Sequence, residues 1–520
     1  MRENNDKKNL DVKALFGKVK SMWSTPLEGR YLNLKEILSF GGTALGVSFI
    51  VNIISSLITA TQISEVYQIG VMHGPIICLV ASVLGLIIQP IYGKLLQNTN
   101  TKWGRYKPYI IFIAPVISVC AILATWQPQN LTETSRMIYA YLVCIPTLVL
   151  WNLWNNTFNM MPAVITPNQQ ERTDIWAPIG LVIGFAPTIM NFIKGFIRSY
   201  FLSIGKEYMA YRWMGFISVA VGLLLVSLIF KVKERIIVTQ ENKEKVGLLE
   251  GLKMVTRNKP LMIFSLALIL GCMRTTIEVD AEMMGKLRYA TTIEDGLKVF
   301  SSLTLLTGFA ATPNMILLPL FTRKFNNKTI LMGWLGCNAL GYAILGIIGV
   351  QNIPQGTISA VVITALRFVA LFNAIGSLQP LMLSEIYDYQ QYKTGKRLEG
   401  FIQTFAYALV LVFTNLANVV MAYVKQGMGY EPKNYFNISV VSDELMKVAT
   451  KYFNLALIVS AISAGLMLIT MIFYNLSKKD HKRIMEELKA RELGEITNEV
   501  VGEQVALENA TEENSVEVAE

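Results

Sequence analysis

Four asparagines and two tryptophans fall within one apolar stretch of the chain. They are Asn152, Asn155, Asn156 and Asn159, with Trp151 and Trp154 beside them. Positions i, i+3, i+4 and i+7 share one face of a helix, so the four amides should lie side by side. Amides offer paired donors and acceptors to hydroxyl groups, and an indole ring offers a flat face to the C–H surface of a sugar. The pattern predicts contacts to a neutral polyol; hydrogen bonding between helices is the alternative.

Two other apolar stretches contain ionisable residues, which are costly in hydrocarbon and therefore indicate candidate functional sites. One holds Arg367 near its middle and Asn373 further along, and we interpret both as solute contacts. The other holds Arg274, Glu278 and Asp280. Arg274 and Glu278 are one helical turn apart and suited to an ion pair. These three residues are candidates for coupling to a cation, with a structural ion pair as the alternative.

The elements that must position these residues are membrane-spanning helices. The chain has 520 residues, of which 52% are apolar and 16% charged. Apolar runs of about 20 residues, the length that crosses a bilayer, occur at 36–60, 74–96, 109–127, 137–164, 176–200, 209–231, 260–281, 298–321, 329–350, 356–384, 400–424 and 452–475. The predicted fold class is an all-α polytopic membrane protein with twelve transmembrane helices in two six-helix halves.

The predicted organisation has five parts. They are an N-terminal segment with an amphipathic helix (1–35), a first half (36–231), a polar linker (232–259), a second half (260–475) and a charged, partly disordered tail (476–520). Lys and Arg concentrate before the first span and in alternate loops, which predicts that both termini are cytoplasmic in the cell membrane. The net charge of +10 reflects this bias, so a lipid bilayer is the expected partner and nucleic acid is not.

Metal, cofactor and enzyme chemistry have little support in the sequence. The five cysteines lie inside apolar runs without metal-type spacing, and the chain has two histidines. No nucleophile and base cluster together. We therefore expect no cofactor, no metal site and no catalytic residues.

Two polar segments carry a family resemblance. The first matches at Pro90, Gly93, Thr99, Thr101, Gly104, Arg105 and Pro108, and the second at Asp388, Tyr389, Lys393, Thr394, Gly395, Arg397, Glu399 and Gly400. Both resemble the signatures of the glycoside-pentoside-hexuronide cation symporters, the melibiose-permease-like branch of the major facilitator superfamily. The resemblance implies twelve spans and sugar transport. We interpret six signature residues as a cytoplasmic gate: Gly104, Arg105, Asp388, Tyr389, Arg397 and Glu399.

The chain departs from this family at its acidic residues. In the same register, three family aspartates become Gly85, Gln89 and Gln97. A neutral amide cannot take up a proton near neutral pH, so coupling to a cation at this place is in doubt. Gln89 is instead a candidate solute contact. Relatives have an acidic sugar-binding residue near Thr43, which is a candidate contact here, with helix packing as the alternative.

The predicted function is secondary active transport of a small solute, a sugar or glycoside, by alternating access. Either transport is uncoupled, or Na⁺ or H⁺ is a co-substrate whose coupling acid has moved, with Glu278 and Asp280 as the first candidates. Arg367 allows an anionic cargo such as a hexuronide. The alternatives are a carrier of lysolipids or other amphiphiles or organic anions on the same fold, and a membrane sensor that transports nothing.

Overall fold

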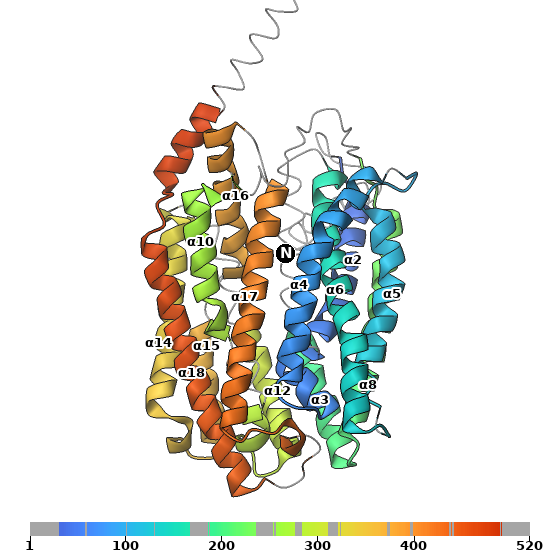
Figure 1. Cartoon of the computed structure of the whole chain (residues 1–520), viewed down its shortest axis with the longest axis vertical. Helices are drawn as coiled ribbons and strands as arrows, with labels where there is room; N and C mark the ends of the chain where they lie inside the picture. Colours follow the sequence, from blue (N-terminus) through green and yellow to red (C-terminus); the bar gives the residue numbers. More distant parts are fainter. Residues whose placement is uncertain are drawn as a thin grey trace, which may run out of the picture.

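The computed structural model is a bundle of helices that run roughly along its long axis (Figure 1). It describes residues 31–57, 60–99, 101–128, 130–166, 186, 188–235, 253, 256–275, 283–309, 321–322, 324–371, 375–395, 399–435, 438, 441–488 and 490. We call the end that holds the loop 99–106 and the helix 478–488 the upper end, and the end that holds α3 and α12 the lower end.

The N-terminal half comprises the described residues from 31 to 235. Its helices are α2 (Leu34–Leu57), α3 (Ala60–Tyr67), α4 (His73–Asn98), α5 (Lys107–Thr125), α6 (Glu133–Ile165), a helix over 188–203, α8 (Glu207–Val226) and the 3₁₀ helix η1 (Ser227–Lys231). Local sequence sets several boundaries. The Thr132 hydroxyl caps α6 by accepting from the Ser135 amide, and Pro108 occupies the first turn of α5, where its missing N–H is tolerated.

The C-terminal half comprises the described residues from 256 to 488. Its elements are α10 (Lys259–Leu270), η3 (Cys272–Thr275), a short helix over 283–288, α12 (Ile293–Phe309), α14 (Asn327–Ile348), η4 (Val350–Asn352), α15 (Thr357–Leu371), α16 (Ile375–Thr394), α17 (Glu399–Gly427), η5 (Pro432–Tyr435), α18 (Asp443–Ile472) and a helix over 478–488. Asn258 caps α10 and Ser442 caps α18, each by accepting from the amide three residues later.

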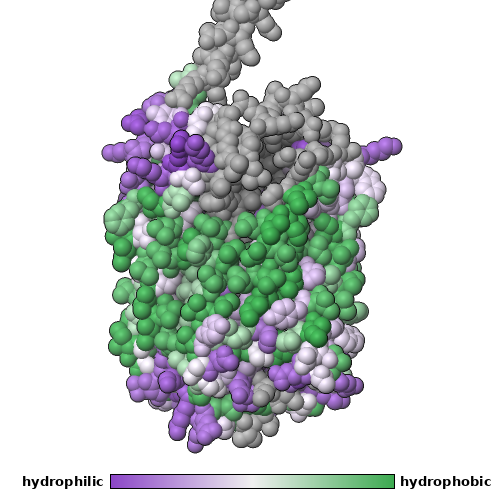
Figure 2. All heavy atoms as spheres, viewed as in Figure 1, coloured by the Kyte–Doolittle hydropathy of each residue, from purple (hydrophilic) through white to green (hydrophobic). Residues whose placement is uncertain are grey.

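Several of these helices can cross a membrane. Within the described part of the chain, seven are long and apolar enough by length and composition. Figure 2 shows a hydrophobic band across the middle of the visible face and hydrophilic residues at both ends. The predicted span 74–96 falls within α4, whose apolar part, His73–Gln89, is shorter than these seven, and the others coincide with shorter helices or extend outside the described residues, so the number twelve stays a prediction.

The seventh predicted span, 260–281, is not a continuous α-helix. α10 ends at Leu270 and gives way at Gly271 to the 3₁₀ helix η3. The carbonyls freed at this break are satisfied from α18, because the Ser463 hydroxyl donates to the Leu270 carbonyl at 2.6 Å and the Ser460 hydroxyl to the Met273 carbonyl at 3.2 Å. Irregular backbone at membrane depth is tolerated when protein groups satisfy it in this way.

Each half has hydrophobic cores of its own. One cluster of buried residues lies entirely between Leu32 and Val232. Two others lie in the C-terminal half, apart from Val71, which joins one of them from the loop before α4. The halves therefore pack as two bodies, with apolar contact between them at the lower end.

Candidate functional site

The amide face predicted on α6 is only partly covered by protein. Asn152, Asn155 and Asn156 are half-buried and Asn159 is exposed. The Asn152 amide donates to the carbonyl of Leu148, one turn earlier, at 3.1 Å. Asn155, Asn156 and Asn159 have no hydrogen-bond partner among the described residues. Amides in this state can bind the hydroxyls of a solute.

Gln89 lies at a similar depth on the neighbouring helix α4. The hydroxyls of Tyr92 on α4 and Thr157 on α6 are 2.7 Å apart, which fixes the register of the two parallel helices. Gln89 precedes Tyr92 by three residues, about 4.5 Å along the axis. Asn155 and Asn156 precede Thr157 by one or two residues, so the half-buried Gln89 lies within about one helical turn of their level.

Two of the predicted solute contacts are inaccessible. Trp154 is fully buried and donates from its indole nitrogen to the Ile110 carbonyl on α5 at 3.1 Å. Two residues from Asn152 and Asn156, it faces away from the amides. Thr43 is also fully buried, and its hydroxyl donates to the Ser39 carbonyl at 2.9 Å. Because both side chains pack helices together, we do not retain them as solute contacts.

Trp151 differs from Trp154 in its surroundings. Its ring is half-buried and packs against the N-terminal core. Its indole nitrogen is buried and has no hydrogen-bond acceptor among the described residues. A buried unpaired donor costs about 1–3 kcal/mol. Solvent does not reach this nitrogen in the described conformation, so Trp151 offers a solute its half-buried ring.

Several predicted site residues cannot be placed. Glu278, Asp280, Asn373 and Arg397 lie outside the described residues, as do the side chains of Arg367 on α15 and Glu399 at the start of α17. The predicted N-terminal amphipathic helix and most of the linker and tail also lie outside them. Arg274 lies in η3, where it donates to the Gly271 carbonyl at 3.1 Å and so supports the break after α10.

The first signature loop is held by the residues that follow η1. The Glu234 carboxylate accepts from the backbone amides of Arg105, Tyr106 and Lys107 at 2.7, 3.1 and 2.7 Å. It therefore caps the start of α5, where the helix dipole favours a negative charge. Gly104 has φ +112°, and a Cβ there would collide with Glu234, so both its conformation and its neighbour require glycine. These contacts lie within the N-terminal half.

The second signature contacts the C-terminal helix. His481 Nε2 lies 2.9 Å from the carboxylate of Asp388 on α16. The hydrogen bond to Asp388 raises the pKa of His481, although partial burial opposes it. Tyr389 is half-buried against one of the C-terminal cores, to which the 478–488 helix contributes Ile484 and Leu488. The contacts described here for each signature thus lie within its own half.

A buried ion-pair network at the lower end was not predicted from sequence. Glu207, the first residue of α8, is fully buried and accepts from Nη2 of Arg198 at 2.5 Å. Its carboxylate also lies 3.3 Å from Nζ of Lys286, which belongs to the other half. Lys286 donates in addition to the main-chain carbonyl of Tyr435 at 3.0 Å. The network thus joins the halves.

The sequence indicated only part of this network, namely the positions of its charges and not their pairing. Arg198 lies near the end of the predicted run 176–200, and Glu207 lies two residues before the next run, 209–231. Charges at such positions are usually solvated at the membrane surface. The pairing of Glu207 with Lys286, 79 residues later, depends on how helices of the two halves meet.

Comparison with known proteins identifies one family. The family model described as MFS/sugar transport protein matches residues 39–478. Among curated proteins, the uncharacterized symporter YnaJ of Bacillus subtilis is 23% identical, with 82% of this chain and 89% of that protein covered. The glucuronide carrier protein homolog of Escherichia coli is 21% identical (85% and 94% covered), and the isoprimeverose transporter of Lactiplantibacillus pentosus is 22% identical (82% and 86% covered).

Solved structures give the same fold. The crystal structure of a D-xylose-proton symporter superposes with a TM-score of 0.55, covering 86% of this chain and 98% of that one. Its sequence identity is 15%, so this likeness shows the fold alone.

Proposed function

Because the chain belongs to the MFS/sugar transport protein family, as its two signature segments predicted, we propose that it carries a sugar or glycoside across the cell membrane by alternating access. The chain is a multi-pass membrane protein and a transporter, not an enzyme. The match over residues 39–478 carries the proposal, because it includes both halves of the bundle. Twelve spans and two cytoplasmic termini belong to the same proposal.

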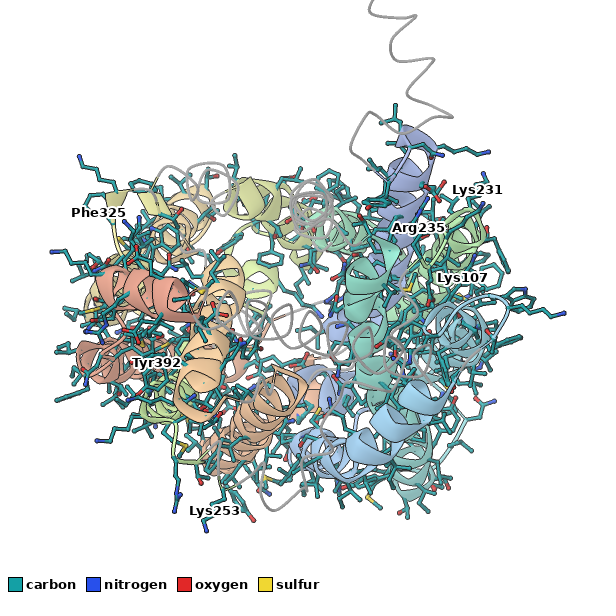
Figure 3. The ribbon with its side chains drawn as sticks, turned by 90° about the horizontal axis from the view of Figure 1, so that it is seen from above. Lys107, Lys231, Arg235, Lys253, Phe325 and Tyr392 are labelled. Carbon is teal, nitrogen blue, oxygen red and sulfur yellow. The ribbon has the colours of Figure 1, made fainter. Side chains whose placement is uncertain are left out.

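Separate hydrophobic cores support a rocking mechanism. Each half can move as a body without opening its own core, and the contacts between halves are then what must break and reform. We assign the upper end to the cytoplasm because Lys107, Lys231, Arg235 and Lys253 lie there (Figure 3). Since the network of Glu207 and Lys286 joins the halves at the lower end, the conformation described here is closed toward the outside.

The solute site in this proposal is the amide face of α6. Asn155 and Asn156 supply donors and acceptors, Gln89 adds a third amide at similar depth, and Trp151 adds a half-buried ring. These groups are neutral, which suits hydroxyls. Arg367 would add a cation for a uronate, and the named relatives include carriers for a glucuronide and for isoprimeverose.

Uptake into proteoliposomes tests this function. Labelled neutral glycosides and uronates would be offered with and without Na⁺ and pH gradients. We expect saturable uptake of at least one glycoside. Selective uptake of uronates that is lost in Arg367→Gln would assign the anion to that residue. Failure of the whole panel, with the protein folded and correctly inserted, would refute sugar transport.

The same assay addresses coupling. Gln89 stands where the family has an acid, so we expect glycoside to equilibrate down its own gradient without Na⁺ or H⁺. Accumulation against the gradient that needs either ion would contradict this. Its loss in Glu278→Gln or Asp280→Asn would then place the coupling acid at the seventh span.

An amphiphile carrier is the second candidate, and one groove favours it. A space of about 420 Å³ between α10, η3, α17 and α18 has an almost entirely apolar lining that includes Met273, Phe413, Leu416 and Ile462. Phe413, Leu416 and Ile462 are also exposed, so the groove opens on the surface of the helix bundle. Uptake of a fluorescent lysolipid in place of glycosides would favour this candidate.

A further inference from the structure

Buried charges from both halves gather at the lower end of the bundle. The N-terminal half supplies Glu207 with Lys194 and Arg198, which are one turn apart on the 188–203 helix, and the C-terminal half supplies Lys286 and Lys425; all five are buried. A buried ion is tolerated when it is paired and hydrogen-bonded. The carboxylate that pairs with Lys286 belongs to Glu207 in the opposite half, so this ion pair depends on the halves being closed.

The pairing of Glu207 is asymmetric. Arg198 contacts Glu207 from within the same half, and its guanidinium also lies over the Tyr211 ring at 5.3 Å. When the halves separate, Glu207 therefore keeps Arg198, whereas Lys286 loses its carboxylate and keeps only the Tyr435 carbonyl among these contacts. Opening then requires the Lys286 ammonium to be hydrated by water that enters from the lower end.

A second contact between the halves is connected to the first. The Tyr430 hydroxyl donates to the carboxylate of Glu65 on α3. The Tyr430 ring stacks on Tyr435 at 4.5 Å between centroids, and Nζ of Lys425 lies 5.2 Å from the Tyr430 centroid. Because the Tyr435 carbonyl binds Lys286, the segment from Tyr430 to Tyr435 links the two contacts.

On the basis of the alternating access proposed above, we propose that the Glu207–Lys286 ion pair is the latch of the outer gate, with the Tyr430–Glu65 hydrogen bond as its second contact. The latch sets the equilibrium between the closed and open lower end. Lys286 and Glu207 are positioning residues, because neither belongs to the amide face of α6. Their effect is on which side of the membrane the solute site faces.

The test measures the separation of the halves directly. Spin labels would be placed at Ser203 and Thr291, two exposed lower-end positions in opposite halves, with the five native cysteines replaced by alanine. Electron–electron distances would be recorded in nanodiscs without solute. Lys286→Met keeps the length of the side chain and removes the charge. Lys286→Arg keeps the charge, and Lys298→Met is the matched control, because Lys298 pairs with Asp295 in an exposed contact within its own half.

We expect Lys286→Met to raise the ratio of open to closed molecules about tenfold or more, and Lys286→Arg and Lys298→Met to leave it near the wild-type ratio. Tyr430→Phe, which keeps the ring stack, should raise it by less. An unchanged distance distribution in folded Lys286→Met and Tyr430→Phe would refute the latch even if glycoside uptake is normal. A shift in distances without uptake of any sugar would support the latch and refute the proposed cargo instead.

Discussion

Replacing Gly195 by alanine should destabilise the closed lower end, because a methyl group has no room there. Gly195 lies on the 188–203 helix, and an added Cβ would overlap the hydroxyl of Ser301 on α12 of the other half. It would also lie 3.0 Å from the Leu297 carbonyl, which cannot rotate away. Overpacking of this kind costs about 1–3 kcal/mol. The gain in helix propensity, about 1 kcal/mol, is the same in both conformations and cancels from their equilibrium.

The expected shift toward the open conformation is therefore roughly 5- to 150-fold. Distances between spin labels at Ser203 and Thr291 would measure it. Gly41→Ala on α2 is the matched control, because nothing lies within 4 Å of a Cβ at that position. Ser301→Gly should restore much of the closed population in the double variant. A Gly195→Ala protein that stays closed like the wild type would show that these two helices do not hold the halves together.

Three further outcomes are expected. Glu234→Ala removes the acceptor for three backbone amides at the start of α5 and should lower stability by about 1–3 kcal/mol, seen as a lower melting temperature; unchanged melting would contradict the capping role. The raised pKa of His481 means that its contact with Asp388 is fully stabilising below the ordinary histidine pKa and is lost as pH rises through the raised pKa, so the hydrogen-exchange protection factors in 478–488, from which the intrinsic pH dependence of exchange is divided out, should fall with pH in the wild type and be independent of pH in His481→Gln. Asn156→Ala should reduce glycoside uptake by about tenfold, as the loss of a hydrogen bond to solute predicts, whereas Leu142→Ala, exposed on the same helix, should not.

Much of the scaffold could be predicted from the sequence. Apolar runs locate helices because the length of hydrocarbon they cross is fixed, and the predicted run 137–164 falls within α6 (Glu133–Ile165). The four asparagines share a face because helical periodicity is local. The break at Gly271 was missed, since an apolar sequence does not reveal that Ser460 and Ser463 on α18 will satisfy the freed carbonyls.

Contacts between residues that are far apart in the sequence could not be predicted. Trp154 is as suited to a sugar ring as Trp151, and only the position of α5 shows that its N–H binds Ile110. From the sequence alone, Glu207 is a charge at the end of a predicted span. It is nevertheless fully buried, because the start of α8 packs against the other half. Such contacts depend on tertiary packing, which periodicity and composition do not encode.

When acidic residues lie beside the solute, one site both binds the solute and controls the conformation. In this chain the buried charges lie away from the amide face of α6, which separates these two tasks. At mid-depth this chain has Gln89, Asn155 and Asn156, whose neutral amides need no counter-ion in either conformation. At the lower end it has Glu207 and Lys286, whose pairing is made only when the halves close. In the mechanism proposed above, the amides thus bind the solute and the ion pair sets the conformational preference. Lys286→Met should accordingly change the rate of uptake through the open-to-closed equilibrium, whereas Asn156→Ala should change the affinity for glycoside and leave the distance distribution as it is.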